Sequence, residues 1–593
     1  MTEYLLPTDP KSSLGNAVPL KKNNFNKFIN RKYEKYKIPE KKKSFKDICF
    51  PEKYTLQIPQ KFLPAYINPD TPYDSILVVH KIGAGKTCTS IRIAEEWKHL
   101  RKIIVVVPAA LKNNFFNELR SECTGDTYIT SKERLLLKQL NPVTDKYQNI
   151  IEASNARINK YYEVHSYNKF VELYNEGSIN LKHKVLIVDE VQNMVSEGGL
   201  FYETLHKAIK QAKTKKDNLR TILLSATPIF DKPHEIALTL NLLNLDEELP
   251  TGKNFENMFI EQKMKGDKMY YDIKNVDYLK KIIRGRVSYY RGAPSYVFPQ
   301  LNMHVVKCKM ESFQYRSYLT VSSAETLGKL SYKTKQKIFQ SGEIMELPNN
   351  FHLGTRIISN IAFPNLNVSE KGYDSLNNKN VKQKLKSYSI KFYKILKKVK
   401  RSKGPIFIFS NFKEYGGIKS LMKVLEENGY CNYDENGTGK NRFAVWSSDV
   451  KPSLREEIRN VYNRKENFNG SLIKIILGSP SMKEGVSLFR VRQIHILEPY
   501  WNEARLDQVI GRGVRFCSHK DLDKDSRNVD VYLYIAMHNE IKETVDQYIY
   551  KLACQKTLLI SKFIKVLKEA AVDCTLFKNA NVGPDEEPFV CDV

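Results

Sequence analysis

Residues 75–87 read Ser-Ile-Leu-Val-Val-His-Lys-Ile-Gly-Ala-Gly-Lys-Thr and join a short apolar strand to a glycine-rich loop. Glycines let backbone N–H groups approach phosphates, and a following helix turns its positive N-terminal end toward negative charge. Lys86 is expected to neutralise the β- and γ-phosphates, and the Thr87 hydroxyl to ligate Mg²⁺. The general pattern has glycine where His80 stands, so only the shorter G-x-G-K-T form is intact. The candidate nucleotide-binding residues are Lys81, Ile82, Gly83, Ala84, Gly85, Lys86 and Thr87.

A second apolar strand, at residues 185–188, delivers Asp189 and Glu190 to its carboxyl end. Strands of a parallel sheet carry their sites at that end, so these acids are expected beside Lys86. Asp189 would hold the Mg²⁺ shell, and Glu190 would accept the proton of the attacking water. The sequence leaves the role of Gln192 open.

A third apolar run, at residues 221–224, is followed by Ser225, Ala226 and Thr227. Small hydroxyl residues at this position can switch hydrogen bonds between the nucleotide site and a neighbouring lobe. We therefore expect this tripeptide to couple the two.

Residues 508–515 read Gln-Val-Ile-Gly-Arg-Gly-Val-Arg. On a helix, Arg512 and Arg515 would be three residues apart and share a face. Two guanidinium groups are the fixed cations that a γ-phosphate needs as charge builds in the transition state. The candidate catalytic set is therefore Glu190, Gln508, Arg512 and Arg515, and hydrolysis would require the two halves of the chain to close. The alternative is a surface pair of arginines that forms salt bridges.

Apolar runs alternate with helical stretches in two parts of the chain, which predicts an α/β fold with parallel sheets flanked by helices. The first block contains the runs 75–79, 103–107, 185–188 and 221–224. The second contains 405–409, 443–446, 472–477, 492–497 and 531–534. Two such blocks indicate two similar lobes.

Five segments are expected along the chain. They are a basic flexible arm (1–50), a nucleotide-binding lobe (51–295), a partly helical insertion or linker (296–400), a second lobe (401–540) and a helical extension with an acidic tail (541–593). Residues 11–46 hold twelve Lys or Arg and two acids, which indicates a nucleic-acid tether or a solubilising tail. Residues 382–403 carry ten Lys or Arg and no acid beside an apolar stripe. Their basic face is either solvated or in contact with phosphates.

The chain has 95 Lys and Arg against 66 Asp and Glu, which favours a polyanionic partner, either nucleic acid or an acidic membrane surface. An A+T-rich genome that drifts toward lysine would produce the same excess. There is no run of about 18 apolar residues and no lipidation motif, so we expect no membrane partner.

The cysteines are odd in number, scattered, and without the C-x₂-C spacing of a zinc or redox site. The N-terminus also lacks the layout of a secretory signal. We therefore expect a reducing intracellular compartment and no structural metal.

Taken together, these motifs resemble the superfamily 2 helicase-type ATPases. A closer resemblance is to the poxvirus transcription ATPases, nucleoside triphosphatase I and the small subunit of the early transcription factor. Relatives occur in other large cytoplasmic DNA viruses and on cytoplasmic linear (killer) plasmids of yeasts. The resemblance covers about residues 55–575 and is carried by the stretches 62–87, 223–243, 285–290, 408–417, 478–488 and 500–519.

The resemblance implies two tandem RecA-like lobes with an inserted helical region and a helical C-terminal extension. Gln60 resembles the glutamine that reads adenine in such proteins. Residues 107–109 and 484–487 resemble motifs that grip a nucleic-acid backbone. The candidate nucleic-acid-binding residues are Pro108, Ala109, Glu484, Gly485 and Ser487.

The resemblance further implies a DNA-dependent ATPase that uses ATP and Mg²⁺. It would assist a viral or plasmid RNA polymerase at initiation or termination, in the host cytoplasm or packaged in a virion. Some relatives are not demonstrable unwinding enzymes, so the motor would either separate strands or only translocate. Unwinding in replication or repair, and action on RNA, are also compatible with these motifs. A polymerase-bound scaffold with a vestigial ATP site is a further hypothesis, which the intact Lys86, Asp189 and Glu190 argue against.

Overall fold

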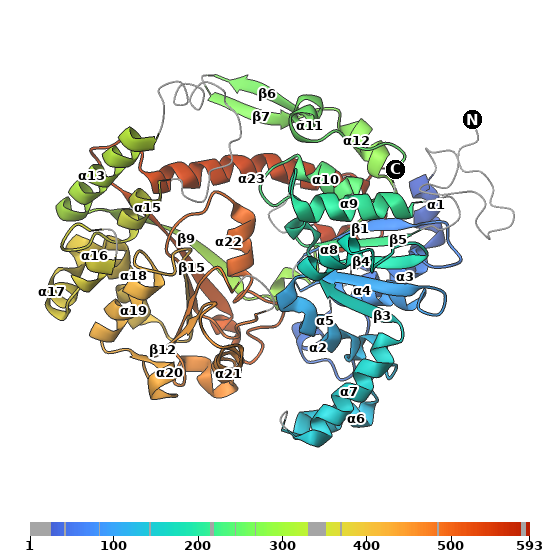
Figure 1. Ribbon diagram of the computed structural model, residues 1–593, viewed down its shortest axis with the longest axis horizontal. Coiled ribbons are helices and arrows are strands. Elements are labelled where there is room, and N and C mark those ends of the chain that lie inside the picture. Colours follow the sequence, from blue (N-terminus) through green and yellow to red (C-terminus); the bar gives the residue numbers. More distant parts are fainter. Residues whose placement is uncertain are drawn as a thin grey trace. The chain divides into compact units, whose positions relative to one another are not determined.

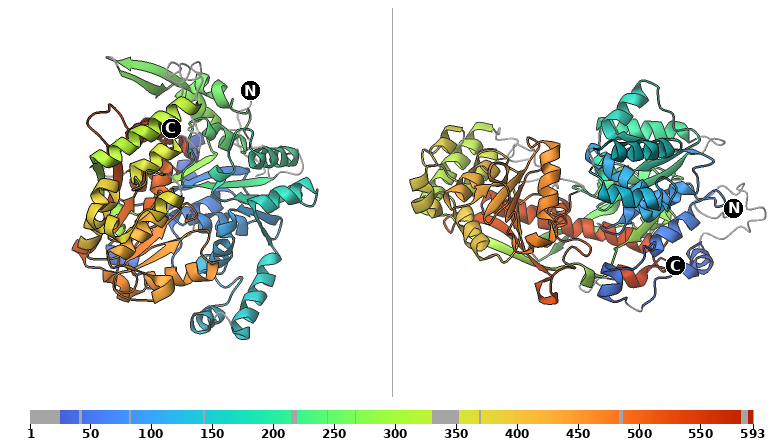
Figure 2. Two further views of the ribbon diagram at one scale, coloured as in Figure 1. Left: turned by 60° about the vertical axis from the view of Figure 1, so that its left-hand side comes forward. Right: turned by 90° about the horizontal axis from the view of Figure 1, so that it is seen from below.

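The chain folds into two compact units in the computed structural model (Figures 1 and 2). The structure describes residues 25–592 except 41–42, 82, 142–143, 214–218, 244, 267, 330–351, 368–369, 483–485 and 583–588. The first unit contains residues 1–295 and 558–593, and the second contains residues 296–557. Within the described residues, no helix has the length and apolar character needed to cross a membrane.

The first unit is built on a sheet with the strand order β3-β2-β4-β5-β1-β8, in which every pair is parallel. Its central strands are rich in β-branched and aliphatic residues and are buried, as parallel strands with helices on both faces must be. The four runs predicted in the first block are therefore confirmed as strands. The strands are β1 (Ser75–His80), β2 (Lys102–Val107), β3 (Tyr162–Ser166), β4 (Lys184–Val188), β5 (Arg220–Ser225) and β8 (Val287–Tyr290).

Helices cover both faces of this sheet (Figure 1). The crossovers through α4 and α5 run toward β3, and those through α8 and α9 run back toward β5. Because such connections are right-handed, the two pairs of helices lie on opposite faces. The helices of the unit are α1 (Phe25–Lys32), α2 (Phe45–Cys49), α3 (Ile58–Tyr66), α4 (Lys86–Glu95), α5 (Lys112–Leu119), α6 (Ser131–Gln139), α7 (Asp145–Asn159), α8 (Tyr167–Asn175), α9 (Leu200–Ala212), α10 (Glu235–Asn241), α11 (Gly252–Phe259), α12 (Val276–Ile283) and α24 (Lys578–Asn581).

A helical hairpin and a strand hairpin extend from the first unit. The helical pair α6 and α7 points away from the sheet in all views (Figures 1 and 2). The other hairpin is an antiparallel pair of strands, β6 (Ile260–Lys265) and β7 (Lys268–Ile273). Neither hairpin was predicted from the sequence.

The expected flexible arm at residues 1–50 is wrong for the part that the structure describes. Phe25, Ile29 and Tyr33 follow one another at intervals of four residues and are buried in the core of the first unit. This spacing is that of an amphipathic helix, but the lysine-rich composition of residues 11–46 conceals it. Residues 1–24 lie outside the described residues.

The predicted C-terminal helix is confirmed as α23 (Val545–Ala570), which begins in the second unit and ends in the first. The segment after it belongs to the first unit, where Val572, Leu576 and Phe577 join the same core as α1. Phe589 and Cys591 in the acidic tail are also buried. The tail therefore contributes to the packing of this unit.

The second unit is built on a sheet with the order β11-β12-β13-β10-β14-β15-β9, again with parallel pairs. The strands are β9 (Gln300–Lys309), β10 (Ile406–Phe409), β11 (Cys431–Asn432), β12 (Arg442–Trp446), β13 (Ile475–Gly478), β14 (Gln493–Ile496) and β15 (Asn528–Met537). The predicted strands of the second block are confirmed, and β9 was missed. It pairs with β15 along all ten of its residues.

The helices of the second unit are α13 (Ser312–Lys329), α15 (Leu353–Asn360), α16 (Glu370–Asp374), α17 (Asn378–Tyr388), α18 (Ile390–Arg401), α19 (Ile418–Glu427), α20 (Tyr433–Asn436), α21 (Pro452–Tyr462), α22 (Glu503–Ile510) and the first half of α23. The boundary expected at residue 295 coincides with the division between the units. The segments 296–400 and 401–540, in contrast, lie in one unit. The apolar stripe predicted for residues 385–399 is confirmed as part of its core.

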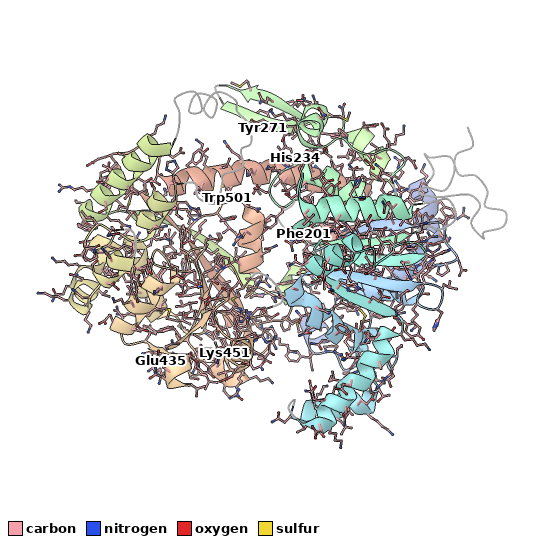
Figure 3. All side chains as sticks on the ribbon, viewed as in Figure 1. Phe201, His234, Tyr271, Glu435, Lys451 and Trp501 are labelled. Carbon is pink, nitrogen blue, oxygen red and sulfur yellow. A yellow bond between two sulfur atoms is a disulfide. The ribbon has the colours of Figure 1, made fainter. Side chains whose placement is uncertain are left out.

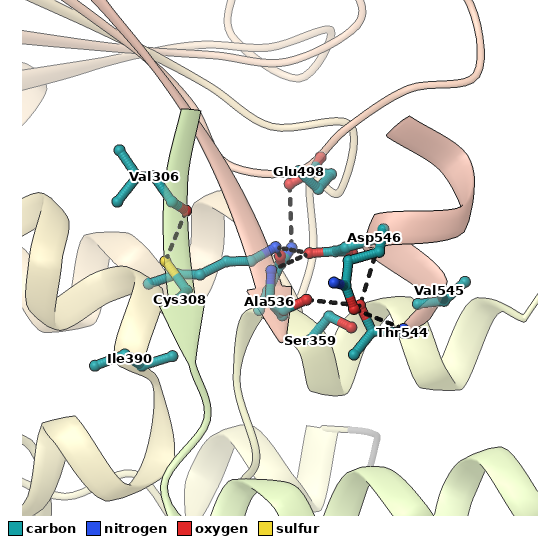
Figure 4. A network of polar contacts seen from close by, with 12 residues as sticks. Val306, Cys308, Ser359, Ile390, Glu498, Ala536, Thr544, Val545 and Asp546 are labelled. Carbon is teal, nitrogen blue, oxygen red and sulfur yellow. Dashed lines mark hydrogen bonds and ion pairs between the residues drawn. The ribbon is translucent and has the colours of Figure 1, made fainter. Parts of the chain in front are cut away.

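A buried polar network ties the separate segments of the second unit together (Figure 4). The Lys391 ammonium group lies 2.7 Å from Asp546 Oδ2 and 2.8 Å from Asn360 Oδ1. Asn360 Nδ2 in turn donates to Glu498 Oε2 at 3.1 Å, and Ser410 donates to the same carboxylate. Lys391 is thus an exception on the basic face of residues 382–403, since it is fully buried.

Disulfides within the described residues join Cys88 to Cys123 and Cys574 to Cys591. The scattered cysteines had predicted a reducing intracellular compartment, in which such bonds are rare, so the disulfides differ from that expectation. The paired cysteines are 35 and 17 residues apart in sequence, and the fold brings them together without a recognisable spacing.

Asp546→Ala is expected to destabilise the second unit by about 3–5 kcal/mol, because it leaves the Lys391 ammonium group buried without its carboxylate. Urea unfolding followed by tryptophan fluorescence would measure this, since Trp446 and Trp501 (the latter labelled in Figure 3) both belong to this unit. The double variant Lys391→Met with Asp546→Ala removes both charges and should recover most of the loss. A double variant as unstable as Asp546→Ala would contradict this interpretation.

Candidate functional site

The loop between β1 and α4 has the backbone of an anion cradle. Gly83 and Gly85 have φ angles of 84° and 70°, in the left-handed region that favours glycine. The positive φ at Gly85 strains any side chain there, and a Cβ at that position would also lie 2.4 Å from the end of the Gln60 side chain. The ten-residue helix α4 begins directly at Lys86 without a side-chain cap, which leaves its first N–H groups for a ligand. Ile82 lies outside the described residues.

Lys86 faces both predicted carboxylates. Its Nζ atom lies 2.5 Å from Glu190 Oε1 and 3.4 Å from Asp189 Oδ1. Burial on its own would lower the pKa of Lys86, but the two acids outweigh it and raise that pKa. Burial raises the pKa of Asp189, and Lys86 offsets this in part. The predicted meeting of the loop with the end of β4 is therefore present in the structure.

Glu190 has a strained backbone. Its φ angle of 49° is in the left-handed region, which costs a non-glycine residue roughly 1–2 kcal/mol. The hydroxyl of Tyr167, at the start of α8, donates to the carbonyl oxygens of Asp189 at 2.6 Å and Glu190 at 3.0 Å. Tyr167 thus holds the turn that presents both carboxylates, and no motif in the sequence pointed to it.

Gln192, whose role the sequence left open, connects two of the predicted motifs. Its Nε2 atom donates to Glu190 Oε2 at 2.7 Å, and its Oε1 atom accepts the Ser225 hydroxyl at 2.7 Å. Ser225 Oγ in turn accepts the backbone N–H of Thr227 at 3.0 Å. A change at Ser225–Thr227 can therefore reach the Glu190 carboxylate through one amide side chain.

Thr87 and Asp189 offer oxygen ligands of the kind that Mg²⁺ prefers. Asp189 is buried at the end of β4, and Thr87 lies half-buried in the first turn of α4. Together with the glycine-rich loop and Lys86, these two oxygen ligands fit a nucleoside triphosphate bound with a divalent cation.

Gln60, the candidate adenine reader, is buried in α3. Its Oε1 atom accepts the backbone N–H of Gln57 at 2.8 Å, and its Nε2 atom is 3.4 Å from the Gly85 carbonyl oxygen. The structure therefore places Gln60 directly against the loop.

The candidate nucleic-acid contacts are described only in part. Ala109 is exposed where the chain enters a short 3₁₀ helix after β2, whereas the preceding Pro108 is buried. In the second unit, Ser487 is half-buried, and its carbonyl accepts the Asn463 side chain at 2.8 Å. Glu484 and Gly485 lie outside the described residues.

The prediction that Arg512 and Arg515 share a helix face is wrong. α22 ends at Ile510, and the glycines at 511 and 513 lead the chain into turns. Arg512 is buried, with Nη1 at 3.4 Å from the Val486 carbonyl oxygen. Arg515 Nε donates to the Gly511 carbonyl at 2.9 Å, and burial lowers the pKa of Arg515. Gln508 is half-buried on α22.

Known protein families match this chain in both of its blocks. The SNF2-related domain matches residues 59–401, and the helicase conserved C-terminal domain matches residues 390–517. These ranges contain the Lys86 loop, residues 189–190 and residues 508–515.

Among similar proteins is a "Putative ATP-dependent RNA helicase" of Acanthamoeba polyphaga mimivirus, 51% identical over 96% of this chain and 98% of its own length. A "Termination factor NPH-I homolog" of African swine fever virus is 28% identical over 84% of this chain and 76% of its own. Among solved structures, the helicase domain of Pyrococcus furiosus Hef covers 83% of this chain and 97% of its own, with 14% identity and a TM-score of 0.39.

Gln192→Leu leaves an uncharged side chain of similar size but removes both hydrogen bonds, so the Glu190 carboxylate loses its orientation. We expect nucleotide binding to persist and hydrolysis to fall by roughly tenfold or more, toward the range of general-base effects. Steady-state turnover and nucleotide titration would measure the two quantities. Gln211→Leu, at an exposed glutamine on α9, is the matched control. Equal turnover in the two variants would rule out the proposed connection.

Proposed function

The chain belongs to the SNF2-related family of helicase-type, nucleic-acid-dependent ATPases, and we propose that it translocates on DNA in support of a viral RNA polymerase. The observation that carries the ATPase assignment is that the predicted motifs of the first unit contact one another at one site. There Lys86 meets Asp189 and Glu190, and Gln192 connects them to Ser225.

Residues of the first unit bind the substrate and prepare the water. The N–H groups of residues 83–87 and the Lys86 ammonium group hold the phosphates, and Gln60 lies where a base can reach it. Glu190 Oε1 is paired with Lys86, and its Oε2 is held by Gln192. When phosphates draw Lys86 away, Glu190 is free to accept the proton of a water molecule. Mg²⁺, held by Thr87 and Asp189, would supply charge neutralisation.

The second unit supplies the cations for the transition state. Arg512 and Arg515 are separated from Lys86 by more than 400 residues in the sequence, so they act only when nucleic acid brings the units together. Residues 108–109 and 484–487 would hold its backbone. A shift of residues 225–227 on nucleic-acid binding would then change the orientation of Glu190 through the Gln192 hydrogen bonds.

Two features support this proposal. The relative named as a termination factor favours a role in transcription, and the 95 Lys and Arg against 66 Asp and Glu favour a nucleic acid as partner. A second candidate is an RNA helicase, which the name of the mimivirus relative favours. Unwinding in replication or repair is the third.

We place the activity in the host cytoplasm. The disulfides Cys88–Cys123 and Cys574–Cys591 add a stage at which the protein is oxidised, because such bonds persist in oxidising settings that include virions. Packaging in a virion is therefore part of the proposal.

Glu190→Gln keeps the size of the side chain but removes the base. ATP should bind and remain unhydrolysed, with turnover lower by about 10²–10⁴-fold. Lys86→Ala is the comparison variant. It should lose hydrolysis because it removes the cation that contacts the phosphates. If Glu190→Gln hydrolyses ATP within about threefold of the wild type, another residue is the base.

ATPase rates with single-stranded DNA, duplex DNA and RNA separate the two leading candidates. We expect duplex DNA to stimulate the most, and stronger stimulation by RNA would favour the second candidate. Arg515→Ala should bind ATP normally but lose most of the stimulation, since arginine fingers contribute about 10³-fold or more. Full stimulation of Arg515→Ala would refute the role given to the second unit.

A further inference from the structure

Asp573, in the segment that follows α23, is fully buried against β8. Its Oδ1 atom accepts the backbone N–H of Tyr289 at 3.0 Å, and its Oδ2 atom accepts the Ser288 hydroxyl. β8 is the edge strand that pairs with β1, and β1 ends in the nucleotide-binding loop. A residue near the C-terminal end of the chain therefore fixes the strand beside that loop.

Ser288 connects this carboxyl group to His80. The Ser288 Oγ and His80 Nε2 atoms are 3.0 Å apart. Because the serine hydroxyl donates to Asp573, its oxygen accepts from His80. The other ring nitrogen, Nδ1, is buried without a hydrogen-bond partner among the described residues, so Ser288 alone orients the ring by hydrogen bonding. Burial, with a smaller contribution from Lys86, lowers the pKa of His80 to about 3, which keeps the ring neutral.

The end of β8 also touches the loop directly. The Lys81 N–H donates to the Tyr290 carbonyl at 3.1 Å, and a Cβ at Gly292 would lie 3.4 Å from Ala84 Cβ. On the other side, Asn581 of α24 donates to the Tyr289 carbonyl at 2.9 Å and accepts the Arg291 N–H at 2.8 Å. Residues 573–581 thus hold β8 and the turn after it where they meet the loop.

We propose that Asp573 is a positioning residue for the nucleotide site, acting through Ser288 and His80 on the loop that binds the phosphates. His80 stands where the general loop pattern has glycine, so this loop begins with an imidazole ring that must be held in one orientation. Loop amides and Lys86 bind phosphates well only when their geometry is fixed in advance. The inference rests on the proposed ATPase function and adds the C-terminal segment to its site.

The test compares Asp573→Ala and Ser288→Ala with the wild type in the full-length chain. Titration with a fluorescent ATP analogue and steady-state kinetics would give nucleotide affinity, KM and kcat. We expect each variant to bind nucleotide about tenfold more weakly, a free-energy loss of about 1.4 kcal/mol, with kcat within about threefold. The double variant should lose no more than Asp573→Ala alone, because both changes break one chain of contacts.

Asp573→Asn is the conservative rescue. Burial raises the pKa of Asp573 to about 7, with the Ser288 and Tyr289 hydrogen bonds lowering it in part. An amide of the same size can keep both contacts with one direction reversed, because its oxygen can accept the Tyr289 N–H and its NH₂ group can donate to the Ser288 oxygen. We expect its nucleotide affinity to stay within about twofold of the wild type. Glu569→Gln is the matched control, because Glu569 precedes the same segment but pairs with Lys280 at 2.7 Å. It should bind nucleotide like the wild type.

Near-UV circular dichroism would show whether each variant is folded. A folded Asp573→Ala protein with wild-type affinity would overturn the proposal, as would losses that multiply in the double variant. If Asp573→Ala does not fold, Ser288→Ala decides, and wild-type affinity in that variant overturns the proposal. If the wild type itself fails to bind ATP, the proposed function is wrong. If the wild type binds and all variants match it, only the positioning role is wrong.

Discussion

The contact between the Lys86 ammonium group and the carboxylates of Asp189 and Glu190 depends on the parallel sheet of the first unit. β1 and β4 are not neighbours in that sheet, because β5 lies between them. Parallel pairing nevertheless directs all three strands the same way, so their carboxyl ends meet at one edge. The cation, the acids and Ser225 gather there, and the short distance between Lys86 and Glu190 follows from strand direction more than from strand order.

Much of this arrangement was predictable from local patterns. Buried parallel strands are continuous apolar runs, and the residues that end them are polar or small, so the strands and the site residues at their ends could be located. The Lys86–Asp189–Glu190 cluster follows from those two signals. The function of Gln192 could not be predicted in this way. Its two partners, Glu190 and Ser225, follow different strands and come together only in the folded sheet. Tyr167 is likewise separated from the turn that it supports.

The errors have physical causes as well. α1 was missed because it lies in a lysine-rich segment, and composition averages hide the narrow stripe formed by Phe25 and Ile29. Most residues of β9 are exposed along an edge of its sheet and Cys308 is its buried residue, so the strand lacks the apolar run of the other strands. The helix predicted for Arg512 and Arg515 failed at the glycines on either side of Arg512. α1 and β9 depend on partners that are distant in sequence, whereas the glycines beside Arg512 are a local cause.

In both units, buried charged or polar groups hold segments that are distant in sequence from the strands and helices they contact. In the second unit, Lys391 and Asp546 join α18 to the beginning of α23. In the first, Asp573 joins the end of the chain to β8. Apolar packing would hold these segments with less loss of solvation, so stability alone does not explain the choice of polar groups. Hydrogen bonds differ from apolar contacts in being directional, and a misplaced segment would leave its own donors and acceptors unpaired. For Asp573, the hydrogen bonds lead through Ser288 to His80, so a segment almost 500 residues further along the chain helps to set the shape of the loop that binds the phosphates.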